Sequence, residues 1–238
     1  MENQMVEGSF LRVIEYLRNN VYNVKFLSES SLKQIKKVHD AAYILAQWKL
    51  DLEKCMISDE NFSEMLSISI QMLHACAFKD EKLLYILLRS LIENFFKYSK
   101  KHFAIENCTY TNELYERLKK HENIKDNQLL KQRYINIWNY YQYASNYVHS
   151  NTTKFLSLYS CVQNYIDREV DDNFRKCTDH IVKVIQEINC ILILIHPMVY
   201  HQMERLTREL IIGFNSQELK IQIHSHFFNN QYSDMLNG

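Results

Sequence analysis

The chain is nearly free of the residues that let a polypeptide turn sharply. Its 238 residues include only three glycines and one proline. The tight turns of β-hairpins need residues that accept positive φ, mostly glycine or asparagine, and a β-rich protein of this length would contain many of them. The shortage favours long helices joined by short connections, so we expect an all-α fold.

A chain of this length fits one domain, or a core with small additions, and can bury a substantial interior. We expect an antiparallel helical bundle over residues 58–213. Additional N-terminal helices are expected to pack on this core from residues 1–57, and a short C-terminal arm or tail is expected at residues 214–238.

The segment 83–98 predicts a helix inside the bundle, because leucine, isoleucine and phenylalanine cover most of its circumference at helical spacing. Arg89 and Glu93 lie one turn apart on the remaining polar strip, and Asn94 lies beside them. A charged pair in a mostly dry region is costly. It is explained either by a structural ion pair that fixes the helix register or by a functional site.

The segment 129–149 predicts a second long helix, which should end where residues 150–153 compete with the helical backbone for hydrogen bonds. One stripe of this helix carries Trp138, Tyr141, Ser145 and His149. An imidazole at the helix end can reach a cleft, and it can equally serve only to complement the helix dipole.

Five tyrosines lie along the same helix: Tyr134, Tyr140, Tyr141, Tyr143 and Tyr147. Aromatic rings can stack on the bases of single-stranded RNA. Rings at helical spacing also pack in cores and interfaces, which is the more common arrangement. The sequence leaves both interpretations open.

These two helices carry a family resemblance. Residues 87–93 read Leu-Leu-Arg-Ser-Leu-Ile-Glu, and residues 141–150 follow the pattern Tyr-x-x-Ala-Ser-x-Tyr-Val-His-Ser. Together they resemble the HEPN superfamily, and within it the branch related to AbiV-type abortive-infection factors, over residues 60–210. The resemblance implies an all-helical bundle that often dimerises, a role in phage defence or a toxin–antitoxin system, and in many members a metal-independent ribonuclease.

The first hypothesis is therefore a HEPN-like effector that acts on RNA. His149 would be general base or acid for attack of a ribose 2′-OH on the adjacent phosphate, because an imidazole titrates near neutral pH. Arg89 would hold the phosphate, Glu93 would orient Arg89, and Ser145 would orient the imidazole or the substrate. Two sites meeting across the twofold axis of a homodimer would supply further cationic groups.

Three further residues are expected to contact the substrate, namely Tyr141, Asn151 and Asn94. One departure from the ribonuclease motif is plain. Catalytic HEPN proteins carry an arginine and a polar residue shortly before the histidine, whereas here no arginine lies between Arg133 and His149.

That departure favours a hypothesis from a different class, a non-catalytic helical binding module. Such an antitoxin-like or scaffold protein would bind a protein partner from the same defence system, or a nucleotide. The formal net charge agrees with it, because 28 basic residues balance 28 acidic ones. A protein that coats nucleic acid by neutralising phosphates usually carries a net positive charge.

We expect neither a metal site nor a cofactor. The histidine pairs His196 and His201, and His224 and His226, have no acid or thiol at a recurring metal-site spacing. The sequence contains no glycine-rich phosphate loop and no nucleophile elbow.

A cytoplasmic protein without a membrane segment is expected. The six cysteines show no C-x-x-C spacing, which is typical of reduced thiols. We find no signal peptide, and the most apolar segment, residues 188–199, is too short to cross a bilayer.

Local signals predict where several elements begin and end. Capping boxes predict helix starts at Ser31 and Asn61. Pro197 predicts a kink or stop near Ile195, and Gly213 suits a C-terminal cap.

Two further segments carry weaker patterns. Residues 155–167 suggest a helix or broken helix. Residues 218–227 alternate between apolar and polar side chains, which suits a short strand or a docking arm.

Overall fold

A computed structural model of the protein describes residues 2–20, 27–149 and 170–236, and the side chains of residues 4–20, 27–148 and 170–227. Within these ranges the chain forms eleven helices and no strand, so the expected all-α fold is confirmed. The helices are α1 (Glu2–Asn20), α2 (Glu29–Lys54), α3 (Glu60–Ala77), α4 (Glu81–His102), α5 (Thr111–Lys120), α6 (Glu122–Lys125), α7 (Gln128–His149), α9 (Asp172–Ile195), α10 (Pro197–Gln202), α11 (Arg205–Phe214) and α12 (Gln217–Leu236).

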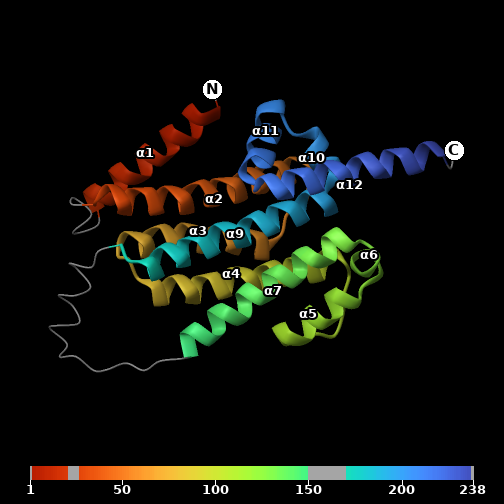
Figure 1. Cartoon of the computed structure of the whole chain (residues 1–238), viewed down its shortest axis with the longest axis horizontal. Helices are drawn as coiled ribbons and strands as arrows, with labels where there is room; N and C mark the ends of the chain where they lie inside the picture. Colours follow the sequence, from red (N-terminus) through yellow and green to blue (C-terminus); the bar gives the residue numbers. More distant parts are fainter. Residues whose placement is uncertain (1, 21–26, 150–169, 237–238) are drawn as a thin grey trace.

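Four of these helices, α2, α3, α4 and α9, lie side by side as the central bundle (Figure 1). The long helix α7 crosses over α4 and α9, and α1, α10, α11 and α12 lie on the opposite side of the bundle. Short connections determine part of this arrangement. Only residues 78–80 separate α3 from α4, so the two helices pack as antiparallel neighbours.

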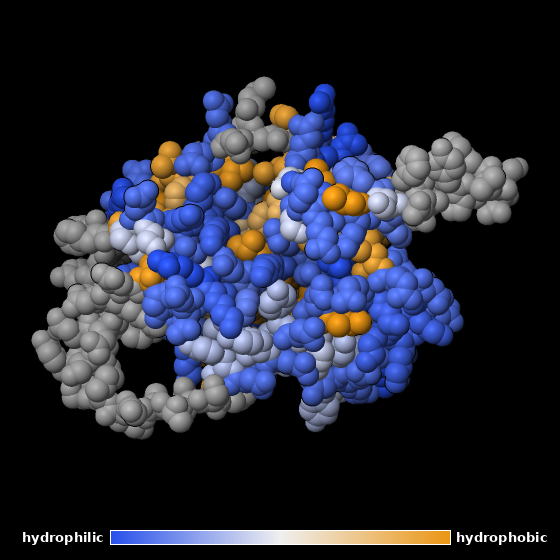
Figure 2. Space-filling view, viewed as in Figure 1, coloured by the Kyte–Doolittle hydropathy of each residue, from blue (hydrophilic) through white to orange (hydrophobic). Residues whose placement is uncertain are grey.

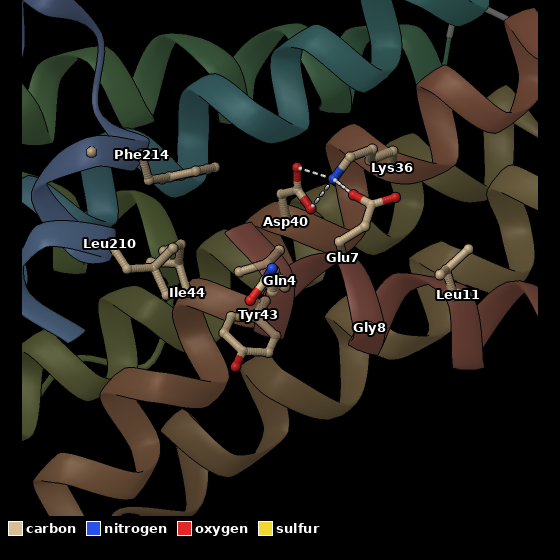
Figure 3. Close-up of a pocket in the computed structure, with 12 residues that line it drawn as sticks. Gln4, Glu7, Gly8, Leu11, Lys36, Asp40, Tyr43, Ile44, Leu210 and Phe214 are labelled. Carbon is tan, nitrogen blue, oxygen red and sulfur yellow. Dashed lines mark hydrogen bonds and ion pairs between the residues drawn. The ribbon is translucent and has the colours of Figure 1, made fainter. Parts of the chain in front are cut away.

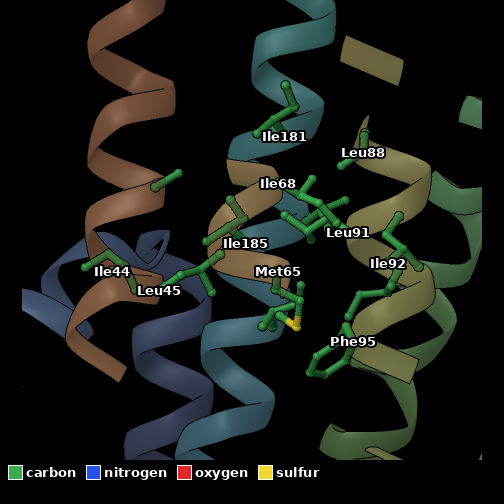
Figure 4. Close-up of a cluster of buried hydrophobic side chains, with 14 of the residues drawn as sticks. Ile44, Leu45, Met65, Ile68, Leu88, Leu91, Ile92, Phe95, Ile181 and Ile185 are labelled. Atoms are coloured by element: carbon green, nitrogen blue, oxygen red, sulfur yellow. The ribbon is translucent and has the colours of Figure 1, made fainter. Parts of the chain in front are cut away.

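The core is formed where apolar faces of the four central helices meet (Figure 4). Ten of its side chains are at most 2% exposed, namely Ile44 and Leu45 of α2, Met65 and Ile68 of α3, Leu88, Leu91, Ile92 and Phe95 of α4, and Ile181 and Ile185 of α9. Each such side chain contributes roughly 1.5–3 kcal/mol through its removal from water. Leu84, Leu88 and Leu91 of the predicted interior helix thus belong to the centre of the molecule. Leu83 and Ile86 of the same helix are 39% and 42% exposed, so its apolar surface is not buried on all sides.

At the starts of α2, α3, α4 and α9, a serine or aspartate side chain accepts a hydrogen bond from a first-turn amide. Ser28, rather than Ser31, caps α2, and its side chain accepts a 3.2 Å hydrogen bond from the Ser31 amide. Asp59, rather than Asn61, caps α3 and accepts from the Asn61 amide at 2.8 Å. Both predicted caps were wrong by two or three residues, because an earlier side chain reaches the same free amides.

The helix stop before Pro197 is confirmed. Helix α9 ends at Ile195, and Pro197 is the first residue of α10, a position where its missing N–H has no helical partner to lose. The predicted cap at Gly213 was wrong. Gly213 lies inside α11, does not have positive φ, and is followed by the actual C-cap, Asn215.

Of the two alternatives for residues 218–227, the strand was wrong, because this segment belongs to helix α12, and the docking arm stays a prediction. Leu219 and Ile223 are buried, whereas Ile221, between them, is 58% exposed. Spacing of four places two residues on one helix face, so burial follows the helical rather than the alternating pattern. The helix suggested at residues 155–167 lies outside the described residues.

The outer face in Figure 2 is mostly hydrophilic, with scattered hydrophobic residues and a hollow between α1 and α11. In the described part of the chain, no helix combines the length and apolar character that a membrane span requires.

Candidate functional site

Helices α4 and α7 are fixed in antiparallel register by tyrosine hydroxyls of α7, which donate hydrogen bonds to three positions spread along α4. The three pairs are Tyr134 to Ser99 Oγ at 2.9 Å, Tyr141 to Glu93 Oε1 at 3.0 Å, and Tyr147 to Glu81 Oε2 at 2.7 Å. This register brings the two sequence motifs together, because Tyr141 begins the second motif and Glu93 ends the first.

Arg89, Glu93 and Tyr141 form the cluster that we call the Arg89 group. Arg89 Nε donates to Glu93 Oε1 at 3.0 Å, and the guanidinium carbon lies 5.6 Å from the centroid of the Tyr141 ring. The hydrogen bond to Glu93 raises the pKa of Arg89. The side chains of Arg89 and Glu93 are 34% and 27% exposed, so the pair lies at the surface between the helices and can meet a ligand.

An aromatic stack supports the Arg89 group from one side. The ring of Trp138 lies parallel to Tyr141, with centroids 5.0 Å apart and an interplanar angle of 18°. Tyr115 of α5 stacks on the other side of Trp138 at 4.4 Å and 6°. These contacts fix the position of the Tyr141 ring, which in turn fixes the groups that touch it.

The other predicted site residues are not part of the Arg89 group. Asn94 Nδ2 donates to the Ser90 carbonyl of its own helix at 2.9 Å. Ser145 Oγ is buried and makes no hydrogen bond with any described residue. The side chain of His149 and the whole of Asn151 lie outside the described residues.

The backbone of His149 is nevertheless placed, since it is the last residue of α7. Eight residues separate it from Tyr141, which corresponds to about 12 Å of helix rise. Glu81, near the start of α4, is the group that pairs with the last turn of α7 through Tyr147. The structure therefore brings Arg89, Glu93 and Tyr141 together, and it places His149 two turns further along α7.

A pocket of about 490 Å³ lies on another flank of α7, and we call it the α7–α9 pocket. It is lined by Asn136, Asn139, Tyr140 and Tyr143 of α7 and by Lys176 and His180 of α9. Lys176 Nζ lies 4.9 Å from the Tyr143 ring centroid, and the His180 ring lies 4.8 Å from the same ring. Burial lowers the pKa of His180, and the positive charges of Lys176 and Lys183 lower it further.

The sequence did not predict this pocket as a site. Its only local signal is the spacing of three and four residues between polar and aromatic side chains on α7, and of four between Lys176 and His180 on α9. Nothing in either segment indicates that the two stripes face each other, because that depends on the packing of α7 against α9.

Arg133 belongs to a buried ion pair between α7 and α9. It is 7% exposed, and its Nη1 lies 3.1 Å from Glu187 Oε2 of α9. Asn136 Nδ2 also donates to Glu187, at 2.9 Å. Burial raises the pKa of Glu187, while Arg133 and Asn136 oppose that rise. The last arginine before His149 is thus committed to an ion pair between α7 and α9.

A separate titratable cluster surrounds His196. A 2.5 Å hydrogen bond joins Tyr98 Oη and His196 Nε2, and the His102 ring lies 4.7 Å from the His196 ring. Burial and the neighbouring His102 lower the pKa of His196 to about 4. Among the described side chains, no group of three or more His, Cys, Asp or Glu residues is arranged to hold a metal ion.

Comparisons of the chain with models of protein families, with curated proteins and with solved structures found no match. A functional proposal therefore depends on the residues and contacts of this chain.

Proposed function

We propose that this chain is a HEPN-like effector of bacterial antiviral defence, or of a toxin–antitoxin system, that acts on RNA. The observation that carries the proposal is the Arg89 group, in which residues of both resembling motifs hold a partly exposed guanidinium between α4 and α7. A guanidinium offers planar, charged donors that match phosphate oxygens.

Arg89 positions a phosphate of the bound RNA strand. Glu93 and Tyr141 restrict the orientation of the guanidinium, which reduces the entropy lost when a phosphate binds. Because Glu93 offsets the charge of Arg89, further cations are needed for tight binding of a polyanion. A homodimer in which two sites meet across the twofold axis would provide them.

His149 moves the proton. As general base it takes the proton of a ribose 2′-OH, whose oxygen attacks the adjacent phosphorus while the bond to the 5′-oxygen breaks. A protonated group must return a proton to the departing 5′-oxygen, and no metal ion is required. Since about 12 Å of helix rise separates His149 from Tyr141, Arg89 holds the strand at a phosphate other than the one under attack.

The α7–α9 pocket supports an RNA ligand through its chemistry. Its rings of Tyr140 and Tyr143 can stack on a base, its asparagine amides can hydrogen-bond to base edges, and Lys176 can meet a phosphate. Acidic side chains are absent from its described lining. Helix α7 thus presents groups suited to nucleotides on two of its flanks.

The test is RNA cleavage by the purified homogeneous protein and its variants. We expect Arg89→Ala and His149→Ala each to reduce cleavage by about 10²-fold or more, the range for loss of a positioning or proton-transferring group. Arg205→Ala is the matched control, because Arg205 and Glu209 form an Arg–Glu pair of the same spacing on the exposed face of α11. Arg89→Lys should rescue only part of the activity, since lysine lacks the planar fork.

The outcomes separate the classes of function. If the wild-type protein cleaves no RNA and His149→Ala leaves the cellular phenotype intact, the ribonuclease proposal is wrong. If Arg205→Ala loses as much activity as Arg89→Ala, Arg89 has no special role.

The second candidate is a non-catalytic helical module that binds a protein partner from the same system, or a nucleotide. The specific observation in its favour is Arg133, which is engaged with Glu187 and so cannot serve as the missing motif arginine. Purification of the tagged protein from its native cells distinguishes the two functions. A stoichiometric protein partner without bound RNA supports the module, whereas toxicity abolished by Arg89→Ala or His149→Ala supports the enzyme.

A further inference from the structure

Helices α1, α2 and α11 line a partly open cavity of about 720 Å³, which we call the α1–α11 cavity (Figure 3). Its size lies within the range of small-molecule sites in proteins. Apolar walls come from all three helices, through Leu11 of α1, Ile44 of α2, and Leu210 and Phe214 of α11. The charged groups gather on one side, as Figure 3 shows for Lys36, Asp40 and Glu7. The cavity is therefore amphipathic.

The polar side of the cavity carries more negative than positive charge. Lys36 Nζ lies 3.2 Å from Glu7 Oε2 and 3.2 Å from both carboxylate oxygens of Asp40, so one ammonium is shared by two carboxylates. Burial alone would lower the pKa of Lys36, but Asp40 and Glu7 raise it overall. An anionic ligand that approached Lys36 would meet both carboxylates, whereas a cation could pair with either.

His39 also contacts this cluster. Its Nδ1 lies 3.1 Å from Asp40 Oδ1 and its Nε2 lies 3.1 Å from Ser9 Oγ. It is 3% exposed and does not line the cavity. Three charged side chains, two of them acidic, thus face the space itself.

Two of the three glycines of the chain, Gly8 and Gly213, also line the cavity. Both lie inside helices, and neither has positive φ. A Cβ atom built on either would find no other atom within 4 Å, so packing does not require glycine at these positions. Glycine in a helix interior costs about 0.5–1 kcal/mol relative to alanine. What the two glycines do provide is open space beside the backbone of α1 and of α11.

We propose that the α1–α11 cavity binds a small amphipathic organic cation. Its ammonium group pairs with Glu7 and Asp40 in competition with Lys36, and its apolar body lies against Leu11, Leu210 and Phe214 in the space beside the glycines. This site is separate from the Arg89 group and from the α7–α9 pocket, and it does not depend on the proposed action on RNA.

The first experiment compares three probes of equal chain length with the full-length protein. Titration calorimetry with n-octylammonium, octanoate and octanol measures the effect of head-group charge on binding to one apolar body. We expect octylammonium to bind at least tenfold more tightly than octanoate, with octanol between them. Equal or tighter binding of octanoate, or no binding of any probe, overturns the proposal.

The second experiment fills the cavity. Gly8→Leu and Gly213→Leu should fold normally, because the new side chains enter open space, and should each weaken octylammonium binding at least tenfold. Asn19→Leu adds the same side chain at an exposed position of α1 and should bind as the wild type does. Undiminished binding in both glycine variants would place the probe elsewhere and contradict the proposal.

The third experiment removes one positive and one negative side chain of the cavity in turn and compares the effects on octylammonium binding. Lys36→Met removes the internal competitor and should strengthen octylammonium binding about threefold or more, whereas Asp40→Asn should weaken it. Circular dichroism of each variant checks that the fold is retained. In a purely apolar cavity the two substitutions would not change octylammonium affinity in opposite directions. If Lys36→Met and Asp40→Asn both strengthen or both weaken binding, the result would argue against a cation site.

Discussion

His196 lies where a positive charge is unfavourable. It is 8% exposed, it is hydrogen-bonded to Tyr98, and its pKa is lowered to about 4. In the unfolded chain an imidazole has a pKa of about 6.5. At pH values between these two pKa values, the imidazole is protonated in the unfolded chain but stays neutral in the folded protein. Stability from this group is therefore fully present above about pH 6.5 and is lost as the pH falls towards 4.

Urea unfolding between pH 7 and pH 4.5 measures this effect. For the wild type we expect a loss of up to about 3 kcal/mol from His196 over this window. His102, whose pKa is also lowered, adds a loss of the same sign. His196→Gln should be less stable at pH 7 and should show a flatter pH dependence.

His201→Gln is the matched control for this prediction, because His201 is an exposed histidine on the adjacent helix α10. It should keep the slope of the wild type. Parallel curves for His196→Gln and the wild type would show that His196 does not set the acid sensitivity.

Residue spacing predicted the Arg89–Glu93 pair but not its surroundings. A separation of four on one helix is local information, and the ion pair forms as expected at 3.0 Å. The hydrogen bond from Tyr141 joins residues 48 positions apart, and it depends on the packing of α7 across α4. The sequence placed Tyr141 on the stripe with Ser145, and only the fold brought it to Glu93.

At the scale of elements, the glycines of α1 and α11 lower the stability of their own helices. Gly8→Ala and Gly213→Ala should each raise the free energy of unfolding by about 0.5–1 kcal/mol without a ligand, because alanine restricts the unfolded chain and its methyl group meets no neighbour. Chemical denaturation of each variant measures the change. A loss of stability in either variant would mean that α1 or α11 approaches its neighbour more closely than the structure shows.

Helices were predictable where one face carries the apolar residues and the cap lies nearby. Helix α4 satisfies both conditions, with Asp80 accepting a hydrogen bond from the Leu83 amide at 2.9 Å. Helix α12 has a nearby cap, because Ser216 Oγ accepts a hydrogen bond from the Leu219 amide at 3.3 Å, but Leu219, Ile221 and Ile223 fit an alternating and a helical pattern equally well. Contact with α9, which the local sequence does not encode, favours the helix.

At the scale of the whole molecule, one buried amide joins three helices. Asn189 of α9 accepts a hydrogen bond from Trp48 Nε1 of α2 at 2.6 Å, and it donates to the Ile211 carbonyl of α11 at 2.8 Å. A second donation reaches Asn215 Oδ1 at 3.2 Å. All donors and acceptors of this network are buried, so the network determines how α11 packs on the bundle.

Asn189→Leu should lower the free energy of unfolding by about 2–5 kcal/mol, because Trp48 Nε1 and the Ile211 carbonyl would each lose a partner inside the core. Equilibrium denaturation provides the measurement. Asn19→Leu, an asparagine replacement at an exposed position, should change stability by less than about 0.5 kcal/mol. A similarly small effect at Asn189 would show that α11 is held by apolar contacts alone.

The order of the central helices along the chain has a consequence during protein synthesis. Helices α2 and α4 are complete by residue 102, but α9, which packs against both, is complete only at residue 195. At about 5–20 residues per second, a ribosome needs roughly 5–20 s to make the intervening segment. During this interval the nascent chain exposes the leucine-rich surface that α9 later covers. The growing polypeptide should therefore depend on chaperones until its second half emerges.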